Sequence, residues 1–329
     1  MTKENKEKKR RRKLLLLSIL FTSILLITTT YAWFTANRVV SIDALNVHVQ
    51  ADGGLEVSTD AINWKQVITT DDIKNASDTY PGSENQVPYQ LFPTSTGGNV
   101  SNGKLEMFKG EATNTSGTNY VLVANRSIET NSFGEESDGS FIAFDIFFKT
   151  SNQKDLYLSS NSKITYLGDQ SVGIENATRV AFLNEGTSGD NASAAQRLNN
   201  ANNATIWEPN YDVHTSYGVQ NALNTYGLHT STSGAAALPY YGVINDIAAR
   251  DNVSITEATS NRYPNFFKSV TPNIKTPMNN TNNEQILTLN SGITKLRIYM
   301  WIEGQDVDCE DNASYGDISF SLEFTTNPA

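Results

Sequence analysis

Apolar and polar side chains alternate along several stretches of this chain, and this two-residue period limits the fold more than any other feature. It is clearest at residues 296–303 and 317–324, and it recurs at residues 45–49 and 142–148. Successive side chains of a β-strand point to opposite faces of the sheet, so each stretch predicts a strand with one apolar face. Such strands are typical of antiparallel sheets that stack face to face. The pattern predicts an all-β protein, an antiparallel two-sheet sandwich with the jelly roll as its expected form.

Weaker apolar runs add further strands to this sandwich. They lie at residues 105–108, 120–124, 156–158, 164–167, 178–183 and 285–289. Near the start of the folded part, the turn residues Asp-Gly-Gly at 52–54 separate two alternating runs, 45–49 and 55–58. Two such runs around a short glycine turn indicate a β-hairpin.

Between residues 184 and 283 the two-residue period fades, and Asn, Ser, Gly, Thr and Ala become frequent. We interpret 184–283 as a long insertion of loops and short helices, and residues 33–183 and 284–329 as the β-sandwich domain. A helical piece is expected at 192–199. The insertion also contains many aromatic residues. Either they form a surface for carbohydrate or a partner, or they anchor the long loops onto the sandwich.

The extreme N-terminus resembles an export signal. Eight Lys and Arg residues lie within residues 3–13, and the uncharged apolar run 14–27 follows directly. As a helix this run measures roughly 21 Å, which is shorter than the ~30 Å hydrocarbon core of a membrane. Thr30 and Ala32 provide small residues at the third and first positions before a cut, so a signal peptidase is expected to cleave between Ala32 and Trp33.

Two outcomes stay open for this N-terminal segment, residues 1–32. It is either a cleaved signal peptide or, if the helix continues through Phe34, an uncleaved membrane anchor. Both place the rest of the chain outside the cell, with the Sec pathway as the expected route. In either case the segment contacts the membrane before cleavage.

Charge and cysteine content restrict the function further. Without residues 1–13 the chain has 17 Lys and Arg against 33 Asp and Glu, a net charge of −16, which opposes binding of nucleic acid. Cys309 is the single cysteine, so the chain cannot form an intramolecular disulfide.

The residues Thr30-Tyr31-Ala32-Trp33-Phe34, placed directly after a short apolar run, resemble the exit signal of the TasA and camelysin family of exported bacterial proteins. The resemblance implies processing by the dedicated SipW-type signal peptidase of that family. It also implies a jelly-roll protein of the cell surface or biofilm matrix in a Gram-positive bacterium. Some members polymerise into fibres by lending an N-terminal strand to the next subunit, so self-association or contact with other matrix and surface proteins is expected.

Residues 33–42 have the composition that such a donated strand needs. They are mostly uncharged, and Val40 and Ile42 are β-branched. Trp33 and Phe34, or Val40 and Ile42, would fill pockets on the neighbouring subunit. The alternative is that this segment pairs within its own subunit as the first strand.

Carboxylates at alternate positions mark one acidic turn near the C-terminus. Asp306, Asp308 and Glu310 are followed by Asp317, eleven residues after the first of them, which resembles a calcium-binding loop. The sixth position, where such a loop has Gly, is Asp311. The alternative is a solvated turn between strands, and no other cofactor is expected.

No catalytic motif stands out in the sequence. The three histidines, His48, His214 and His229, lie outside any His-Glu-x-x-His helix, so zinc peptidase chemistry lacks its usual ligands. We therefore predict a non-enzymatic structural protein of the cell surface or extracellular matrix. An adhesin or glycan-binding module using residues 184–283 is the alternative, and a surface metallopeptidase is the third hypothesis.

Overall fold

The computed structural model describes residue 13 and residues 40–50, 54–116, 119–131, 133–134, 140–169, 172–220, 241–243, 252–254, 267–269, 272–304, 306, 308–309 and 316–328. The predicted cleavage site, Ala32 and Trp33, and the neighbouring Phe34 lie outside these residues. Within the described part, no helix has both the length and the apolar character needed to cross a membrane.

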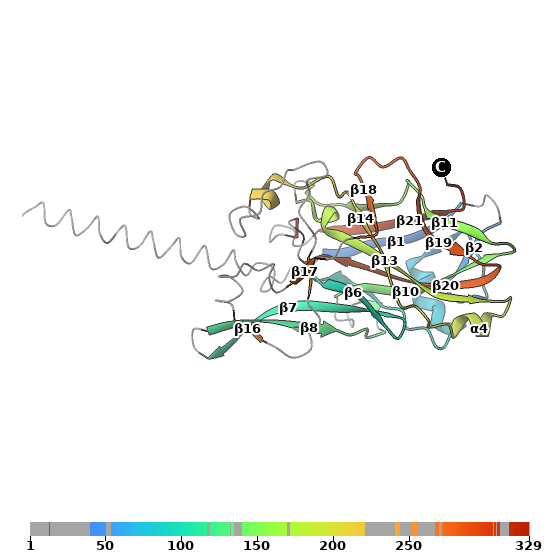
Figure 1. Ribbon diagram of the computed structural model, residues 1–329, viewed down its shortest axis with the longest axis horizontal. Helices are drawn as coiled ribbons and strands as arrows, with labels where there is room; N and C mark the ends of the chain where they lie inside the picture. Colours follow the sequence, from blue (N-terminus) through green and yellow to red (C-terminus); the bar gives the residue numbers. More distant parts are fainter. Residues whose placement is uncertain are drawn as a thin grey trace, which may run out of the picture.

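The described chain is mostly β-strand, arranged in several mixed sheets (Figure 1). Sheet A has seven strands in the order β19-β11-β21-β1-β3, with β12 on β21 and β5 on β1. Its strands are β1 (Val40–Val49), β3 (Val67–Thr69), β5 (Gln90–Leu91), β11 (Lys154–Leu158), β12 (Lys163–Tyr166), β19 (Glu284–Leu289) and β21 (Asp317–Thr325). Sheet B has six strands in the order β18-β14-β13-β20-β10-β2. They are β2 (Glu56–Ser58), β10 (Ile142–Thr150), β13 (Thr178–Ser188), β14 (Thr205–Pro209), β18 (Ile274–Thr276) and β20 (Gly292–Ile302).

One hydrophobic core joins the two sheets. The alternate apolar residues of β1 and β21 meet those of β10, β13 and β20 in a single cluster of buried side chains. Aromatic rings mark the contact: Phe324 of sheet A packs edge-on against Phe148 and Phe182 of sheet B, with ring centroids 5.2 and 6.0 Å apart. The strands that the alternation predicts are therefore confirmed, and the arrangement is consistent with an all-β sandwich.

Sheet B is buried on both faces, which the alternation did not predict. Every residue of β20 is buried, and so is every residue of β10 except Lys149. The outer face packs against a second and a third cluster of buried residues, which contain Trp301 and Phe147 respectively. The alternation predicts one apolar face for each of these two strands, but the opposite faces are buried as well because other segments cover them.

The covering segments are short elements and one long hairpin. They include α4 (Ala192–Gln196), β6 (Ser95–Ser101) and β7 (Lys104–Ser116), and β7 pairs with β8 (Asn119–Ser127). The helices α3 (Thr70–Lys74) and η1 (Asn75–Asp78) follow β3, and Ile73 of α3 is buried in the main core. A capping box between Thr69 and Asp72 starts α3, and the side chain of Asn191 caps α4, which lies inside the predicted helical piece. In Figure 1, β7 and β8 extend beyond one end of the two sheets. The remaining elements are β4 (Val87–Pro88), β9 (Phe133–Gly134), η2 (Ile174–Ala177), β15 (Tyr241–Val243), β16 (Asn252–Ser254) and β17 (Phe267–Ser269).

Strand pairing departs from the expected antiparallel order. The first and last strands of sheet A, β1 and β21, run parallel, and so do β14 and β18 in sheet B. The predicted hairpin around residues 52–54 is also wrong, because β1 belongs to sheet A and β2 pairs with β10 in sheet B. The chain passes from sheet A to sheet B between β1 and β2. Alternation identifies a strand and its buried face, but it contains no information about the neighbouring strand.

Part of the expected insertion belongs to the sheet. Thr205–Pro209 and Ile274–Thr276, as β14 and β18, extend sheet B beyond β13. Trp207 is buried in the main core, and its indole N–H donates to Thr276 Oγ1 at 2.8 Å. This ring therefore anchors its segment to the sandwich. Most of residues 221–271 lies outside the described residues, and within this range Tyr241 of β15 and Phe267 of β17 belong to a two-stranded sheet.

Candidate functional site

The N-terminal strand β1 contains the two described residues of the predicted donated segment, Val40 and Ile42. Val40 is buried in the main core, and Ile42 packs against the core from a partly buried position. Farther along the strand, Leu45 and Val47 are fully buried. In this single chain the strand pairs within its own subunit, which is the second of the two arrangements considered from the sequence. Trp33 and Phe34 lie outside the described residues.

The two sides of β1 are unequally paired. On one side, β21 pairs with it from Ser41 to Val49, with one irregularity between Ile42 and Ala44. On the other side, only β5 and β3 reach it, at residues 40–41 and 46–48. The strand therefore fills a slot between β21, which pairs with it along most of its length, and β5 and β3, which pair with it over two short stretches. Without β1, the slot would expose the paired edge of β21 and part of the core.

The acidic turn brings together two of its four predicted calcium ligands. Asp306 and Asp308 lie beside His214, and one potential ligand atom from each of the three is within 4.8 Å of the others. Asp317 is the exposed first residue of β21 and is not part of this group. Glu310 lies outside the described residues. His214 was not linked to the turn by the sequence, since 92 residues separate it from Asp306.

Asp308 is fully buried and has a hydrogen-bond donor on each side of its carboxylate. Oδ1 accepts from the backbone N–H and the hydroxyl of Thr215, at 2.9 and 2.8 Å. Oδ2 lies 3.0 Å from His214 Nδ1 and accepts from Asn176 Nδ2 at 3.2 Å. Burial and the nearby Asp306 raise the pKa of Asp308. Burial lowers the pKa of His214, but the bond to Asp308 outweighs burial and raises it overall. A raised pKa of Asp308 favours its neutral, protonated form, whereas a raised pKa of His214 favours the charged imidazolium. The hydrogen bonds that Asp308 accepts favour the ionised pair.

The donor atoms of this cluster do not match calcium. Calcium takes six to eight oxygen ligands, whereas the described group offers one imidazole nitrogen and two carboxylates. Asp306 Oδ2 already accepts from Arg179 Nη2 at 2.6 Å, and the same nitrogen donates to Glu208 at 2.8 Å. The positive charge next to Asp306 is therefore that of Arg179. The hydrogen bonds of the cluster join the acidic turn to the segment around His214.

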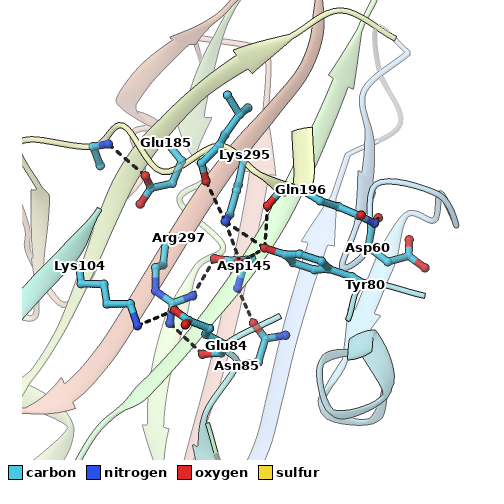
Figure 2. Close-up of polar contacts among 12 residues, drawn as sticks. Asp60, Tyr80, Glu84, Asn85, Lys104, Asp145, Glu185, Gln196, Lys295 and Arg297 are labelled. Atoms are coloured by element: carbon cyan, nitrogen blue, oxygen red, sulfur yellow. Dashed lines mark hydrogen bonds and ion pairs between the residues drawn. The ribbon is translucent and has the colours of Figure 1, made fainter. Parts of the chain in front are cut away.

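A larger buried ionic network lies under the covering layer of sheet B, and the sequence did not reveal it (Figure 2). Asp145 of β10 forms its centre. Its Oδ1 accepts from Arg297 Nη1 at 2.7 Å, and its Oδ2 lies 3.1 Å from Lys295 Nζ. Arg297 Nη2 also donates to Glu129 at 2.7 Å, and Glu129 in turn pairs with Lys104 at 2.9 Å.

Strand register explains why these charges meet. Asp145 lies directly opposite Arg297 across the antiparallel pair β10–β20, and Lys295 is two residues along the same face of β20. A long side chain reaches such a diagonal position. Burial raises the pKa of Asp145, but the charges of Arg297 and then Lys295 outweigh burial and lower it overall. The carboxyl group is therefore ionised at neutral pH.

Tyr80 connects the network to the covering layer. Its hydroxyl accepts from Lys295 Nζ at 3.1 Å, and it lies 3.1 Å from Asp145 Oδ2 and 2.9 Å from the carbonyl oxygen of Gln196. Burial and the charge of Asp145 raise the pKa of this hydroxyl, so it stays protonated. Glu185 is another buried acid of this region, and burial raises its pKa. The sequence signal was charge inside two apolar runs, Asp145 in one and both Lys295 and Arg297 in the other.

One hollow lies at the base of the long hairpin. Its volume is about 200 Å³, and Leu105, Met107 and Phe141 supply apolar walls, with Lys104 and Glu129 among the polar ones.

Comparisons with known protein families, with curated proteins and with solved structures give no match to this chain.

Proposed function

We propose that this chain is a non-catalytic structural protein of the bacterial cell surface or extracellular matrix, which associates with copies of itself by exchanging strand β1. Export through the Sec pathway and cleavage after Ala32 would free the segment that precedes this strand. The jelly-roll form of the two sheets is part of the same proposal. The position of β1 carries it, because the first described strand of the chain fills a slot between elements that come later in the sequence.

Exchange is physically reasonable because a second copy offers an identical strand. Four buried residues of β1, Val40, Leu45, Val47 and Val49, supply roughly 6–12 kcal/mol of hydrophobic stabilisation, whichever subunit the strand comes from. The backbone pairing with β21 is also the same in both arrangements. Closed and exchanged states therefore differ mainly in the connection to the rest of the chain and in any new contact between subunits.

A reversible covalent lock on β1 tests this proposal. Asn46 and Ser321 are register partners on neighbouring strands, and both are partly exposed, so cysteines at these positions can form a disulfide without disturbing the core. The background is mature protein with Cys309→Ser, and the matched control contains Asn46→Cys alone. If β1 is exchanged, oxidation before assembly keeps the double variant monomeric, and reduction restores association.

The order of oxidation and assembly gives a second readout. When the reduced double variant assembles first and is then oxidised, exchange joins neighbouring subunits and yields a ladder of covalent oligomers on a non-reducing gel. Electron microscopy and light scattering report the assemblies. Fibres that form from the locked monomer would exclude strand exchange, and a protein that stays monomeric under all conditions would exclude self-association.

A further inference from the structure

Lys295 and Asp145 bring a primary amine and a carboxyl group into direct contact inside the protein. Lys295 Nζ lies 3.1 Å from Asp145 Oδ2, and their side chains are 8% and 2% exposed. The residues belong to β20 and β10, which are adjacent strands of sheet B. We propose that the two side chains condense into an intramolecular isopeptide bond, a covalent link between these strands.

The groups around the pair are suited to this reaction. Arg297 Nη1 donates to Asp145 Oδ1, the oxygen that does not contact the lysine, at 2.7 Å. A guanidinium at that position stabilises the negative charge that develops on Oδ1 when the carboxyl carbon is attacked. The hydroxyl of Tyr80 lies 3.1 Å from Lys295 Nζ and 3.1 Å from Asp145 Oδ2. It can therefore pass protons from the nitrogen, which must lose them, to Oδ2, which must leave as water.

The step is balanced without any other reactant. The pair rests as ammonium and carboxylate, and one proton passes from Lys295 to Asp145 Oδ2 through the hydroxyl of Tyr80, which leaves the net charge unchanged. The lone pair of Nζ then attacks the carboxyl carbon and forms the C–N bond. A second proton moves from nitrogen to Oδ2, the C–Oδ2 bond breaks, and water leaves. The product is an amide and one molecule of water, with no oxidation or reduction.

Burial favours the product over the starting ion pair. Two charges held away from water carry a desolvation cost, and a neutral amide removes that cost. Exclusion of bulk water also opposes hydrolysis of the amide. Figure 2 shows Tyr80 reaching Lys295 and Asp145 with its hydroxyl, next to Gln196 of the covering layer, and the side chains of Lys295 and Asp145 are only 8% and 2% exposed. The covering segments would therefore have to be in place before the bond forms.

The link would have a clear mechanical role. It would join residues 145 and 295 and so enclose all the described elements from β11 to β19 in one covalent loop. A cross-link over a long loop reduces the freedom of the unfolded chain. The chain has a single cysteine and cannot gain this effect from an internal disulfide. The inference concerns the folded subunit alone and does not depend on strand exchange.

Intact mass spectrometry of the denatured full chain tests the bond directly. The wild-type protein is expected to be lighter than its sequence mass by one water, and a digest should contain a branched peptide that joins Lys295 to Asp145. Lys295→Arg keeps the positive charge but is not expected to condense, so it should have its full sequence mass after the same N-terminal processing. A wild-type protein at full mass would overturn the proposal, as would a branched peptide that joins Lys295 to Glu185.

A second variant tests the part played by Tyr80. Tyr80→Phe keeps the ring, which packs against Phe147 with centroids 5.8 Å apart, and removes only the hydroxyl. Proton transfer by a positioned group accelerates reactions by about 10²–10⁴-fold, so cross-linking should be at least about tenfold slower in this variant. The fraction of cross-linked protein is followed by mass over time after purification. An unchanged rate would remove Tyr80 from the mechanism and contradict the proton route.

Discussion

Asp60 offers a direct test of how a single buried carboxylate stabilises the covering layer of sheet B. It lies after β2, and its side chain accepts from the backbone N–H groups of Ile62 and Asn63 at 2.8 and 2.7 Å. It also accepts from the hydroxyls of Ser58 and Thr79, at 2.7 and 2.5 Å. Burial raises the pKa of Asp60, but these hydrogen bonds outweigh burial and lower the pKa from 3.8 to about 2. Asp60→Asn removes the charged acceptor while keeping the size of the side chain.

The magnitude follows from the linkage between protonation and folding. A pKa that falls by about 1.8 units on folding corresponds to roughly 2.4 kcal/mol of stability, which is fully present above the unfolded pKa. Because the folded pKa is the lower one, this contribution is lost as the pH falls from about 4 to 2. About 0.4 kcal/mol remains at pH 2. The variant should therefore be about 2 kcal/mol less stable than wild type at pH 7, and the difference should nearly disappear in acid.

Urea unfolding, followed by tryptophan fluorescence at several pH values between 2 and 7, measures this difference. Asp190→Asn is the matched control, since Asp190 has a 74% exposed side chain and its ion pair with Lys149 is 3.6 Å long. The control should change the free energy of unfolding by less than about 1 kcal/mol. A gap between Asp60→Asn and wild type that stays constant down to pH 2 would refute the reasoning, because the charge on Asp60 would then not be its source.

Three further predictions follow from the site and the sheets. Arg297→Met should cost about 3–5 kcal/mol in urea unfolding because it leaves buried carboxylates without their partner, whereas Lys275→Met, at a half-exposed ion pair 3.8 Å long, should cost less than about 1 kcal/mol. Gly292→Ala should lower stability by about 1–3 kcal/mol, since φ is +117° and the new Cβ would lie 2.1 Å from a carbonyl oxygen, while Gly189→Ala meets nothing within 4 Å and should be neutral. His214 has a raised pKa in the folded protein, so its contribution to stability is complete below pH 6.5 and declines as the pH rises through the folded pKa. His214→Gln should abolish this decline in thermal unfolding scans from pH 6 to 9. An unchanged decline in the variant would contradict the prediction.

The sequence was sufficient to identify most of the long strands and their buried faces. In β21 the residues Ile318, Phe320, Leu322 and Phe324 point into the core, as their alternation requires. This succeeds because a strand repeats every two residues and one face of each sheet is apolar. The very short strands, such as β4 and β5, escape the same reading because two residues cannot display a period.

Pairing and polar burial could not be derived in the same way. Arg297 lies at a polar position of an alternating strand, yet it is buried beneath a layer that includes Tyr80, more than 200 residues earlier in the chain. The contact between His214 and Asp308 likewise depends on folding and has no spacing in the sequence. Such arrangements depend on which distant segment covers which face, and a local pattern does not contain that information.

The parallel contact between β1 and β21 also determines when this molecule can finish folding. The two partners lie near opposite ends of the described chain, so in the proposed export β1 would emerge early and would have to wait for β21. Contacts between such remote segments form slowly, and the apolar residues of β1 remain exposed until they do. During that interval a neighbouring chain with a completed β21 can capture the waiting strand. Under the proposed function, the local concentration of newly exported chains would then decide between a closed monomer and an intermolecular pair.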